Sequence, residues 1–178
     1  MNGLTNNSIL SLFEDREKNI WIGTDGVGVY KYSGDKFTTY SNQNGLVENY
    51  INTVAQDKQG NYWIGLRNHG LTKISGNQLT TYNPNFKTKN TLPDNNVNII
   101  LPSSTGQLFF GTSQGLSLYE NEVFKTITGP QFQEKYILSL HEDAKHQIWI
   151  GTADGLFKYV NGAVTEVHQI NKFKLPDV

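Results

Sequence analysis

Short apolar runs alternate with polar turns along the whole chain. The first run of each group is rich in β-branched residues and is bounded by residues that favour turns, which is typical of a β-strand. Such runs recur at residues 9–13, 51–54, 97–101 and 137–140. Because no helical period separates these groups, the pattern predicts a chain of short β-strands joined by turns.

An aromatic residue, an apolar residue and a glycine then recur as a block in the strand that follows each run. The four copies begin at Trp21, Trp63, Phe109 and Trp149, so they lie 42, 46 and 40 residues apart. Six positions before the aromatic residue stand Asp15, Asp57, Ser103 and Asp143, and a glycine follows at Gly28, Gly70, Gly115 and Gly155. A repeat of about this length indicates a solenoid or propeller architecture.

The remainder of each repeat predicts two further strands. A third apolar run covers residues 29–32, 71–74, 116–119 and 156–159, and a half-polar fourth strand follows a dipeptide that favours a hairpin. Each repeat is thus a four-stranded antiparallel meander, and four in a row predict an all-β fold of propeller blades. We expect blades at residues 6–40, 48–83, 95–127 and 135–168, in one β-propeller segment spanning 1–178.

The first and last residues of the sequence resemble the joints between its repeats. Residues 2–4 repeat the joint at 44–46, and residues 174–177 repeat the joint at 91–94. We therefore expect a partial propeller whose two end blades each need a neighbour to cover apolar side chains. Three arrangements satisfy this need: closure into a four-bladed ring, a ring completed by self-association with a second copy, or the remaining blades of a longer parent polypeptide.

Charge and cysteine content exclude several classes of function. Fifteen Lys and Arg balance sixteen Asp and Glu, giving a net charge of −1, so no basic field favours nucleic acid or a membrane surface. The apolar stretches are far shorter than the roughly 20 residues of a membrane-spanning helix. There is no cysteine for a disulfide, a thiolate metal site or a nucleophile, and the first residues lack the features of a signal peptide.

The repeats at residues 52–65 and 138–152 resemble the two-component regulator propeller repeat. The resemblance implies the periplasmic sensor propeller of a hybrid histidine kinase, with seven-bladed rings, that takes part in signal transduction and often in carbohydrate sensing. It also implies further domains, a membrane anchor and a kinase outside this segment. The family motif is structural and transfers no catalytic residue. The third repeat departs from it, with Phe109 and Ser103 in place of tryptophan and aspartate, which leaves its turn geometry open.

The repeated residues are interpreted as structural. The tryptophans lie between apolar neighbours in second strands, where core packing is expected. The aspartates cap turns, and the glycines relieve backbone crowding without forming a phosphate-binding loop. His69, His141, His146 and His168 lack the spacing of a metal site, and no Gly-x-Ser-x-Gly motif is present. We therefore predict no enzyme activity, no metal and no cofactor.

Function is then expected in the loops on one face, because the strands are engaged in packing. Loops between second and third strands and joints between blades share this face. The candidate ligand-binding residues there are Asp25, Asn49, Tyr50, Arg67, Asn68, His69, Asn95, Asn96, Gln114, Tyr136 and Asp154. Amides, one arginine, one histidine and aromatic rings suit a neutral or weakly acidic oligosaccharide. The joint at 83–96 is longer than the joint at 41–49 and is a further candidate for specificity.

Three functions remain open on these grounds. The first is a ligand-sensing module for polysaccharide-derived oligosaccharides in a two-component receptor. The second is a propeller lyase, for which His69 and His141 would be the only bases. The third is a structural scaffold for protein contact or dimerisation.

Overall fold

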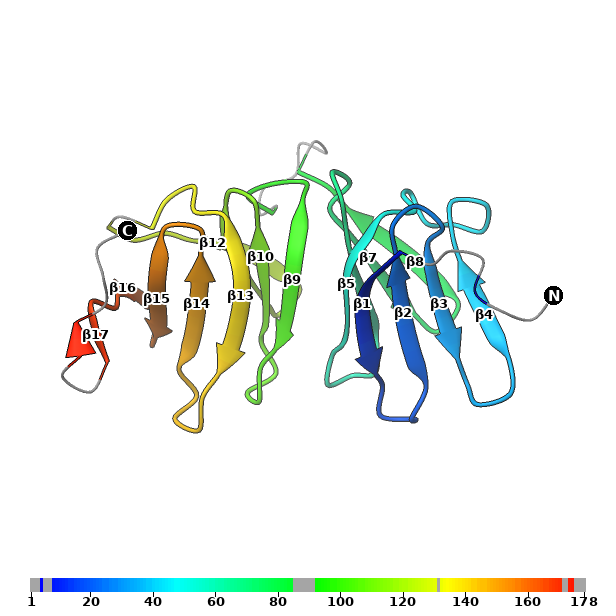
Figure 1. Ribbon diagram of the computed structural model, residues 1–178, viewed down its shortest axis with the longest axis horizontal. Coiled ribbons are helices and arrows are strands. Elements are labelled where there is room, and N and C mark those ends of the chain that lie inside the picture. Colours follow the sequence, from blue (N-terminus) through cyan, green and yellow to red (C-terminus); the bar gives the residue numbers. More distant parts are fainter. Residues whose placement is uncertain (1–3, 5–7, 85–91, 131, 171–172, 175–178) are drawn as a thin grey trace.

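The computed structural model describes residues 4, 8–84, 92–130, 132–170 and 173–174. Four antiparallel sheets stand side by side in an open arc, with the two chain ends at opposite ends of the arc (Figure 1). Each of these four sheets has four strands in chain order, as in a meander. The predicted all-β fold of four propeller blades is therefore confirmed.

Blades one and two have closely similar strands. Their bounds are β1 Ile9–Glu14, β2 Ile20–Thr24, β3 Val29–Tyr32, β4 Phe37–Tyr40, β5 Ile51–Gln56, β6 Tyr62–Leu66, β7 Leu71–Ser75 and β8 Gln78–Tyr82. Each first strand extends past the predicted apolar run into the polar turn. The added residues complete the antiparallel ladder with the second strand, because Glu14 pairs with Ile20 and Gln56 pairs with Tyr62.

Blades three and four repeat this plan. Their bounds are β9 Val97–Pro102, β10 Leu108–Thr112, β11 Gly115–Glu120, β12 Val123–Ile127, β13 Ile137–Glu142, β14 Ile148–Thr152, β15 Gly155–Val160 and β16 Ala163–Glu166. A two-stranded hairpin that the sequence pattern did not predict follows blade four, with β17 Gln169–Ile170 and β18 Phe173–Lys174.

The first strands β1, β5, β9 and β13 are the innermost strands, and consecutive ones adjoin. Each contains a bulge, so that Leu10, Asn52, Asn98 and Leu138 have no partner on the second strand. Asn52 Nδ2 donates to the Val97 carbonyl and Asn98 Nδ2 to the Ile137 carbonyl, both at 3.0 Å. These amides link one inner strand to the next, which the leucines of the end blades cannot do.

Apolar side chains fill the three interfaces between consecutive blades. Trp21 of blade one packs with Val54 and Ile64 of blade two, and Trp63 of blade two packs with Phe110 of blade three. Phe109 and Leu118 of blade three pack in the same way against blade four. Both faces of blades two and three are covered, so the core is a series of inter-blade layers.

In blades one to three, the glycine of the repeated block receives an apolar side chain from the next blade. A Cβ added to Gly65 would lie 3.0 Å from Val97 Cγ1, and a Cβ added to Gly111 would lie 2.5 Å from Ile137 Cγ2. Val97 and Ile137 are fully buried in these contacts. An added Cβ on Gly65 would also lie 2.5 Å from Thr53 Cγ2 of its own blade. The repeated glycine is therefore required by close packing both within the blade and against the next one.

Aspartate, tryptophan and lysine form a repeated cluster on the blade face that meets the next blade. Trp21 Nε1 donates to Asp15 Oδ2 at 2.8 Å, while Lys31, opposite Trp21 in the ladder, places Nζ 5.3 Å from the indole centroid. Blade two has the same arrangement, in which Trp63 Nε1 donates to Asp57 at 2.9 Å and Lys73 lies over the indole. The buried carboxylate of each aspartate therefore accepts a hydrogen bond from the indole N–H in addition to capping its turn.

The next blade completes the first of these clusters. Tyr62 Oη of blade two donates to Asp15 Oδ2 at 2.8 Å, and its ring lies 4.2 Å from that of Trp21. Burial and the nearby Asp15 carboxylate raise the pKa of Tyr62, which therefore remains a donor at neutral pH. A polar contact is in this way built into an otherwise apolar interface.

Blade three replaces all three members of the cluster, with Ser103, Phe109 and Leu118. The turn nevertheless keeps its geometry, because Gln107 N donates to Ser103 Oγ at 3.1 Å and Ser103 N donates to the Gln107 carbonyl at 2.8 Å. The turn left open by the sequence is therefore of the same kind as the others. Without an indole N–H, no carboxylate acceptor is needed there.

The Asp15 cluster predicts a loss of stability in acid. Burial alone would raise the pKa of Asp15, but hydrogen bonds from Trp21, Asn19 and Tyr62 outweigh it and lower the pKa to about 2, from 3.8. A carboxyl with a depressed folded-state pKa stabilises the fold above its unfolded pKa, and this contribution is lost as the pH falls through the folded pKa. We expect urea midpoints of the wild type to fall between pH 3.8 and about 2, and to fall less steeply for Asp15→Asn. Equal pH slopes for both proteins would contradict this assignment.

Candidate functional site

Loops and joints meet on one face of the arc, which we call the loop face. It comprises the loops at 25–28, 67–70, 113–114 and 153–154 with the described parts of the joints at 41–50, 92–96, 128–130 and 132–136. Backbone bonds tie loop to joint in successive blades. Arg67 N donates to the Tyr50 carbonyl at 3.0 Å, Ser113 N to that of Asn96 at 3.1 Å and Ala153 N to that of Tyr136 at 3.1 Å. The expected sharing of one face by loops and joints is seen in the structure.

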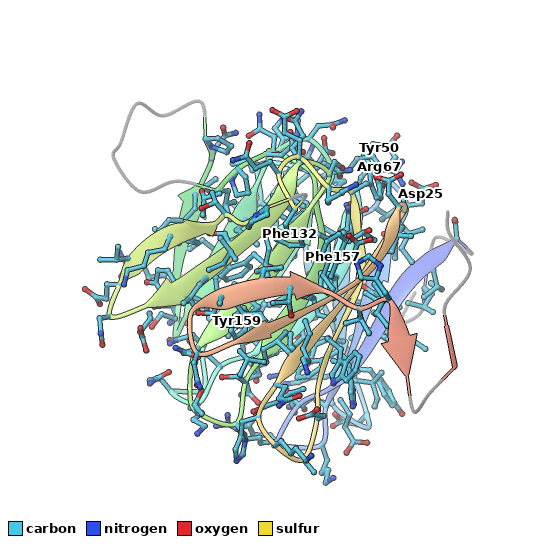
Figure 2. The ribbon with its side chains drawn as sticks, turned by 90° about the vertical axis from the view of Figure 1, so that its left-hand side faces the viewer. Asp25, Tyr50, Arg67, Phe132, Phe157 and Tyr159 are labelled. Carbon is cyan, nitrogen blue, oxygen red and sulfur yellow. The ribbon has the colours of Figure 1, made fainter. Side chains whose placement is uncertain are left out.

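Three side chains from different segments meet between blades one and two. Arg67 Nη1 lies 3.2 Å from Asp25 Oδ1, and the guanidinium carbon lies 5.1 Å from the Tyr50 ring centroid. Figure 2 shows Asp25, Tyr50 and Arg67 near one another at the upper right of the view. The side chains of Arg67 and Asp25 are 42% and 36% exposed, and Tyr50 is 41% exposed, so the cluster is accessible from solvent although Asp25 Oδ1 itself is buried.

The backbone around this cluster is held by the joint. Gly26 N and Gly28 N both donate to the Asn49 carbonyl, at 3.2 and 2.9 Å, and Asp25 pairs with Tyr50 in a short antiparallel bridge. A Cβ added to Gly26 would lie 3.4 Å from the Tyr50 ring, and the φ of Gly26 is +103°. Glycine at this position therefore allows the ring to lie against the loop.

His69 extends the cluster along the same loop. Its Nδ1 lies 3.2 Å from the Arg67 carbonyl and 3.2 Å from Glu48 Oε2. Glu48 in turn accepts from the backbone N–H of Asn49 at 2.6 Å. Asn68, between Arg67 and His69, has a φ of 62°, a left-handed conformation that asparagine tolerates. Glu48 was not among the residues suggested by the sequence.

A second polar group lies on the loop face between blades three and four. Lys135 Nζ is 3.3 Å from Asp154 Oδ2, and Lys135 also lines an open hollow of about 660 Å³ with Thr128, Gly129, Pro130 and Gln133. Phe132 anchors this joint, since it is fully buried with its ring 5.1 Å from that of Phe157 (Figure 2). Neither Lys135 nor Phe132 was suggested by the sequence.

The predicted site residues therefore divide into two groups. Asp25, Asn49, Tyr50, Arg67 and His69 are joined by direct contacts. Asn68 lies between Arg67 and His69 in the same loop. Those placed elsewhere on the loop face are Asn95, Asn96, Gln114, Tyr136 and Asp154.

Two asparagines of this second group differ in their hydrogen bonding. Asn96 Nδ2 donates to Ser113 Oγ at 2.7 Å, and Asn95 Oδ1 is buried without a hydrogen-bond partner in the described part of the chain. Residues 85–91, half of the joint at 83–96, lie outside the described residues.

The chemistry of the first group suits a polar, ring-shaped ligand. An exposed tyrosine ring offers an apolar surface, while the arginine and aspartate beside it offer donors and acceptors. No group of three or more potential metal ligands is found among the described residues.

The opposite face carries a smaller cavity between blades three and four. It measures about 300 Å³ and is lined by Phe109 and Tyr159 with polar groups that include Glu142 and His146. Ser104 Oγ lies 2.7 Å from His146 Nδ1, and the same nitrogen lies 3.0 Å from Glu142 Oε1. A nucleophilic triad needs the serine and the carboxylate on opposite nitrogens of the imidazole, so this group is a turn contact between blades.

The two histidines considered as lyase bases do not meet in one site. His69 lies in the loop between β6 and β7, and His141 lies on β13 of blade four. No contact between them is recorded in the described part of the chain. In the same part, no helix has the length and apolar character needed to cross a membrane.

Comparison with known protein families gave one match. Residues 3–26 and 45–68 match the family model described as two-component regulator propeller. These matches cover the beginnings of blades one and two. No curated protein matches the chain.

Solved structures include extracellular domains from Bacteroides thetaiotaomicron that are described as parts of hybrid two-component systems. One is 30% identical, with a TM-score of 0.73 over 85% of this chain and 21% of that domain. Another is 25% identical, with a TM-score of 0.75 over 94% of this chain and 24% of that domain. The chain thus spans between a fifth and a quarter of the length of these domains.

A virginiamycin B lyase from Staphylococcus aureus also has similar architecture. Its TM-score is 0.71 over 99% of this chain and 59% of the lyase, at 13% identity. At that identity the likeness concerns the fold alone.

Proposed function

Because this chain carries two-component regulator propeller repeats, we propose that it is a segment of the ligand-sensing propeller of a two-component receptor. The similarity to extracellular domains of hybrid two-component systems supports this role. By the same similarity, we place the segment in the periplasm, as part of a membrane-anchored sensor histidine kinase. Its signal would pass through the remaining blades of that receptor.

The ligand class that we propose is an oligosaccharide derived from a polysaccharide. The observation that carries this proposal is the contact of Asp25, Tyr50 and Arg67, brought from three segments to one exposed position. A sugar ring presents apolar C–H groups to an aromatic ring and hydroxyls to charged groups, which matches this set. No equivalent observation favours a lyase, so that alternative is not proposed.

Calorimetry on the 178-residue chain tests this function directly. We would titrate neutral xylo- and manno-oligosaccharides and acidic oligogalacturonides into the wild type, Arg67→Ala, Tyr50→Ala and Lys36→Ala. Since Arg67 and Tyr50 would contact the ligand, each of their variants is expected to lose about tenfold or more in affinity. Lys36→Ala removes an exposed positive charge from the turn between β3 and β4 and should bind as the wild type does.

Two results would contradict the proposal. One is the absence of binding by any of these saccharides. The other is unchanged affinity in both Arg67→Ala and Tyr50→Ala, which would place any binding away from this cluster.

A further inference from the structure

Three of the four repeats hold an ammonium group against an aromatic ring. In the interface between blades one and two, Lys31 Nζ lies 5.3 Å from the ring centroids of both Trp21 and Tyr62. The same nitrogen lies 3.8 Å from Asp15 Oδ2. The corresponding lysines of blades two and four lie 5.2 and 5.5 Å from their indoles. A cation between aromatic rings and a carboxylate is thus a regular part of the repeat.

The interface between blades three and four lacks this cation. Leu118 pairs with Phe109 in the ladder, where blade one pairs Lys31 with its tryptophan. The three groups around Lys31 Nζ correspond by repeat position to Ser103, Phe109 and Ile148. All three line the cavity of about 300 Å³ on the face opposite the loop face. The cavity therefore lies where another interface of the same chain holds an ammonium group.

Two aromatic rings and a carboxylate line this cavity. The Tyr159 ring of blade four lies 5.4 Å from that of Phe109, and both line the space together with Glu142. The side chain of Glu142 is only 13% exposed. Burial alone would raise the pKa of Glu142, but hydrogen bonds from Ser104 and His146 outweigh it and lower the pKa. Glu142 is therefore ionised at neutral pH.

Neither a lysine nor an arginine balances the negative charge around the cavity. In the described part of the chain, the ion pair recorded for Glu142 is with His146 at 3.0 Å, and none is recorded for Glu120. Glu120 lies behind the cavity wall, where its Oε1 accepts from Gln107 Nε2 at 3.1 Å. A bound cation would be attracted by these carboxylates, whereas an anion would be repelled.

The size and the rim of the cavity limit what it can hold. About 300 Å³ is at the lower end of the range for small-molecule sites, so one ring or one short chain fits. Hydroxyl and amide groups at the rim offer further hydrogen bonds, and they belong to Ser103, Thr105, Gln107 and Asn161.

We propose that this cavity binds a small organic ammonium compound. The ammonium group lies against the rings of Phe109 and Tyr159 and beside the Glu142 carboxylate, as the lysine nitrogen does in blade one. Figure 2 shows Tyr159 well away from Asp25, Tyr50 and Arg67, so this site is separate from the oligosaccharide site proposed on the loop face. Amino sugars and alkyl amines share the required chemistry.

Calorimetry with matched pairs of probes tests the proposal on the 178-residue chain. We would titrate 1,5-diaminopentane against 1,5-pentanediol, and glucosamine against glucose, at about pH 7, where aliphatic amines are mostly charged. The amines are expected to bind with a dissociation constant of about 1 mM or less, and the neutral partners about tenfold more weakly or not at all. Binding of one amine only would identify the occupant as an alkyl amine or an amino sugar.

Three variants connect this binding to the cavity. Glu142→Gln keeps a hydrogen-bond acceptor but removes the charge, so amine affinity should fall about tenfold. Leu118→Lys restores the lysine of the other repeats, and its own ammonium should fill the cavity and abolish binding. Glu122→Gln removes the same charge from an exposed turn outside the cavity and should bind as the wild type does. Circular dichroism would check that each variant is folded.

Nuclear magnetic resonance of the wild type locates the amine without relying on any variant. Backbone amide signals of Thr105, Gln107 and Asn161 are expected to shift on addition of 1,5-diaminopentane, while those of the loop-face segments 25–28 and 67–70 stay in place. Shifts confined to the loop face would overturn the proposal. So would the absence of binding by both amines up to about 10 mM, equal affinity for the diol, or unchanged affinity in Glu142→Gln.

Discussion

Replacing Trp63 by alanine is expected to lower the free energy of unfolding by about 3 to 5 kcal/mol, among the largest effects of any single change in this chain. Trp63 has no exposed surface and its ring contacts those of Tyr82, Phe110 and Tyr119, so alanine would leave a cavity between blades two and three. The change also removes the N–H that donates to Asp57, whose carboxylate is buried. Urea denaturation followed by circular dichroism measures the loss.

The repeat itself provides the control for this prediction. Trp149 has the same local sequence and the same bond to an aspartate, but it is only partly buried, and among the described residues no aromatic ring packs on it. Trp149→Ala should cost clearly less than Trp63→Ala. Equal losses would mean that the stabilisation comes from within one blade rather than from the layer between two blades.

Replacing Gly70 by alanine is expected to cost about 3 kcal/mol or more, because two penalties combine at this position. The φ of Gly70 is +77°, where a side chain is strained, and an added Cβ would lie 2.1 Å from the Tyr82 carbonyl oxygen. That oxygen belongs to the backbone of β8, so the last strand of blade two would have to move. Thermal and urea unfolding of the variant would measure the effect.

Gly76 separates these two penalties. Its φ is +57°, but an added Cβ would meet no atom within 4 Å, so Gly76→Ala carries the backbone strain alone. We expect it to cost about 1 kcal/mol. If both variants lose the same stability, the contact with Tyr82 is not the source of the larger effect.

Most of the fold could be predicted from sequence because the repeat consists of residues with strong local structural preferences. The repeated block, which starts at Trp21, Trp63, Phe109 and Trp149, located the second strand of each blade. The turn residues located the hairpins. What the pattern did not reveal is that the repeated aspartate binds the indole six residues later. Each residue had a sufficient explanation by itself, and their bond depends on the ladder register across the turn.

The loss of this cluster in blade three shows the same limit. Ser103, Phe109 and Leu118 looked like separate departures from the repeat, and the turn geometry was left open. In the structure they are one concerted change, because a phenylalanine offers no N–H for a carboxylate and no indole for a lysine to lie over. Recognising this needs the pairing of Phe109 with Leu118.

The candidate site was predicted as a face but not as a set of contacts. Chain topology alone put Asp25, Tyr50 and Arg67 on one face, yet their meeting depends on the bridge between Asp25 and Tyr50. Glu48, Lys135 and Phe132 were missed because they lie in irregular joints, where hydrophobic periodicity carries no signal. Phe132 shows this clearly, since an aromatic residue in a joint gave no sign that it would be fully buried.

The layered core also has a consequence for how the molecule acquires its structure. Every apolar layer is made by two sheets that follow one another in the chain, and the sheets themselves are hairpins of adjacent strands. In the described part of the chain, no apolar layer joins the first blade to the last, so the entropy of closing a very long loop does not arise there. We expect assembly to start at any neighbouring pair of blades and to spread stepwise, and the blade leaving the ribosome first need not wait for the last.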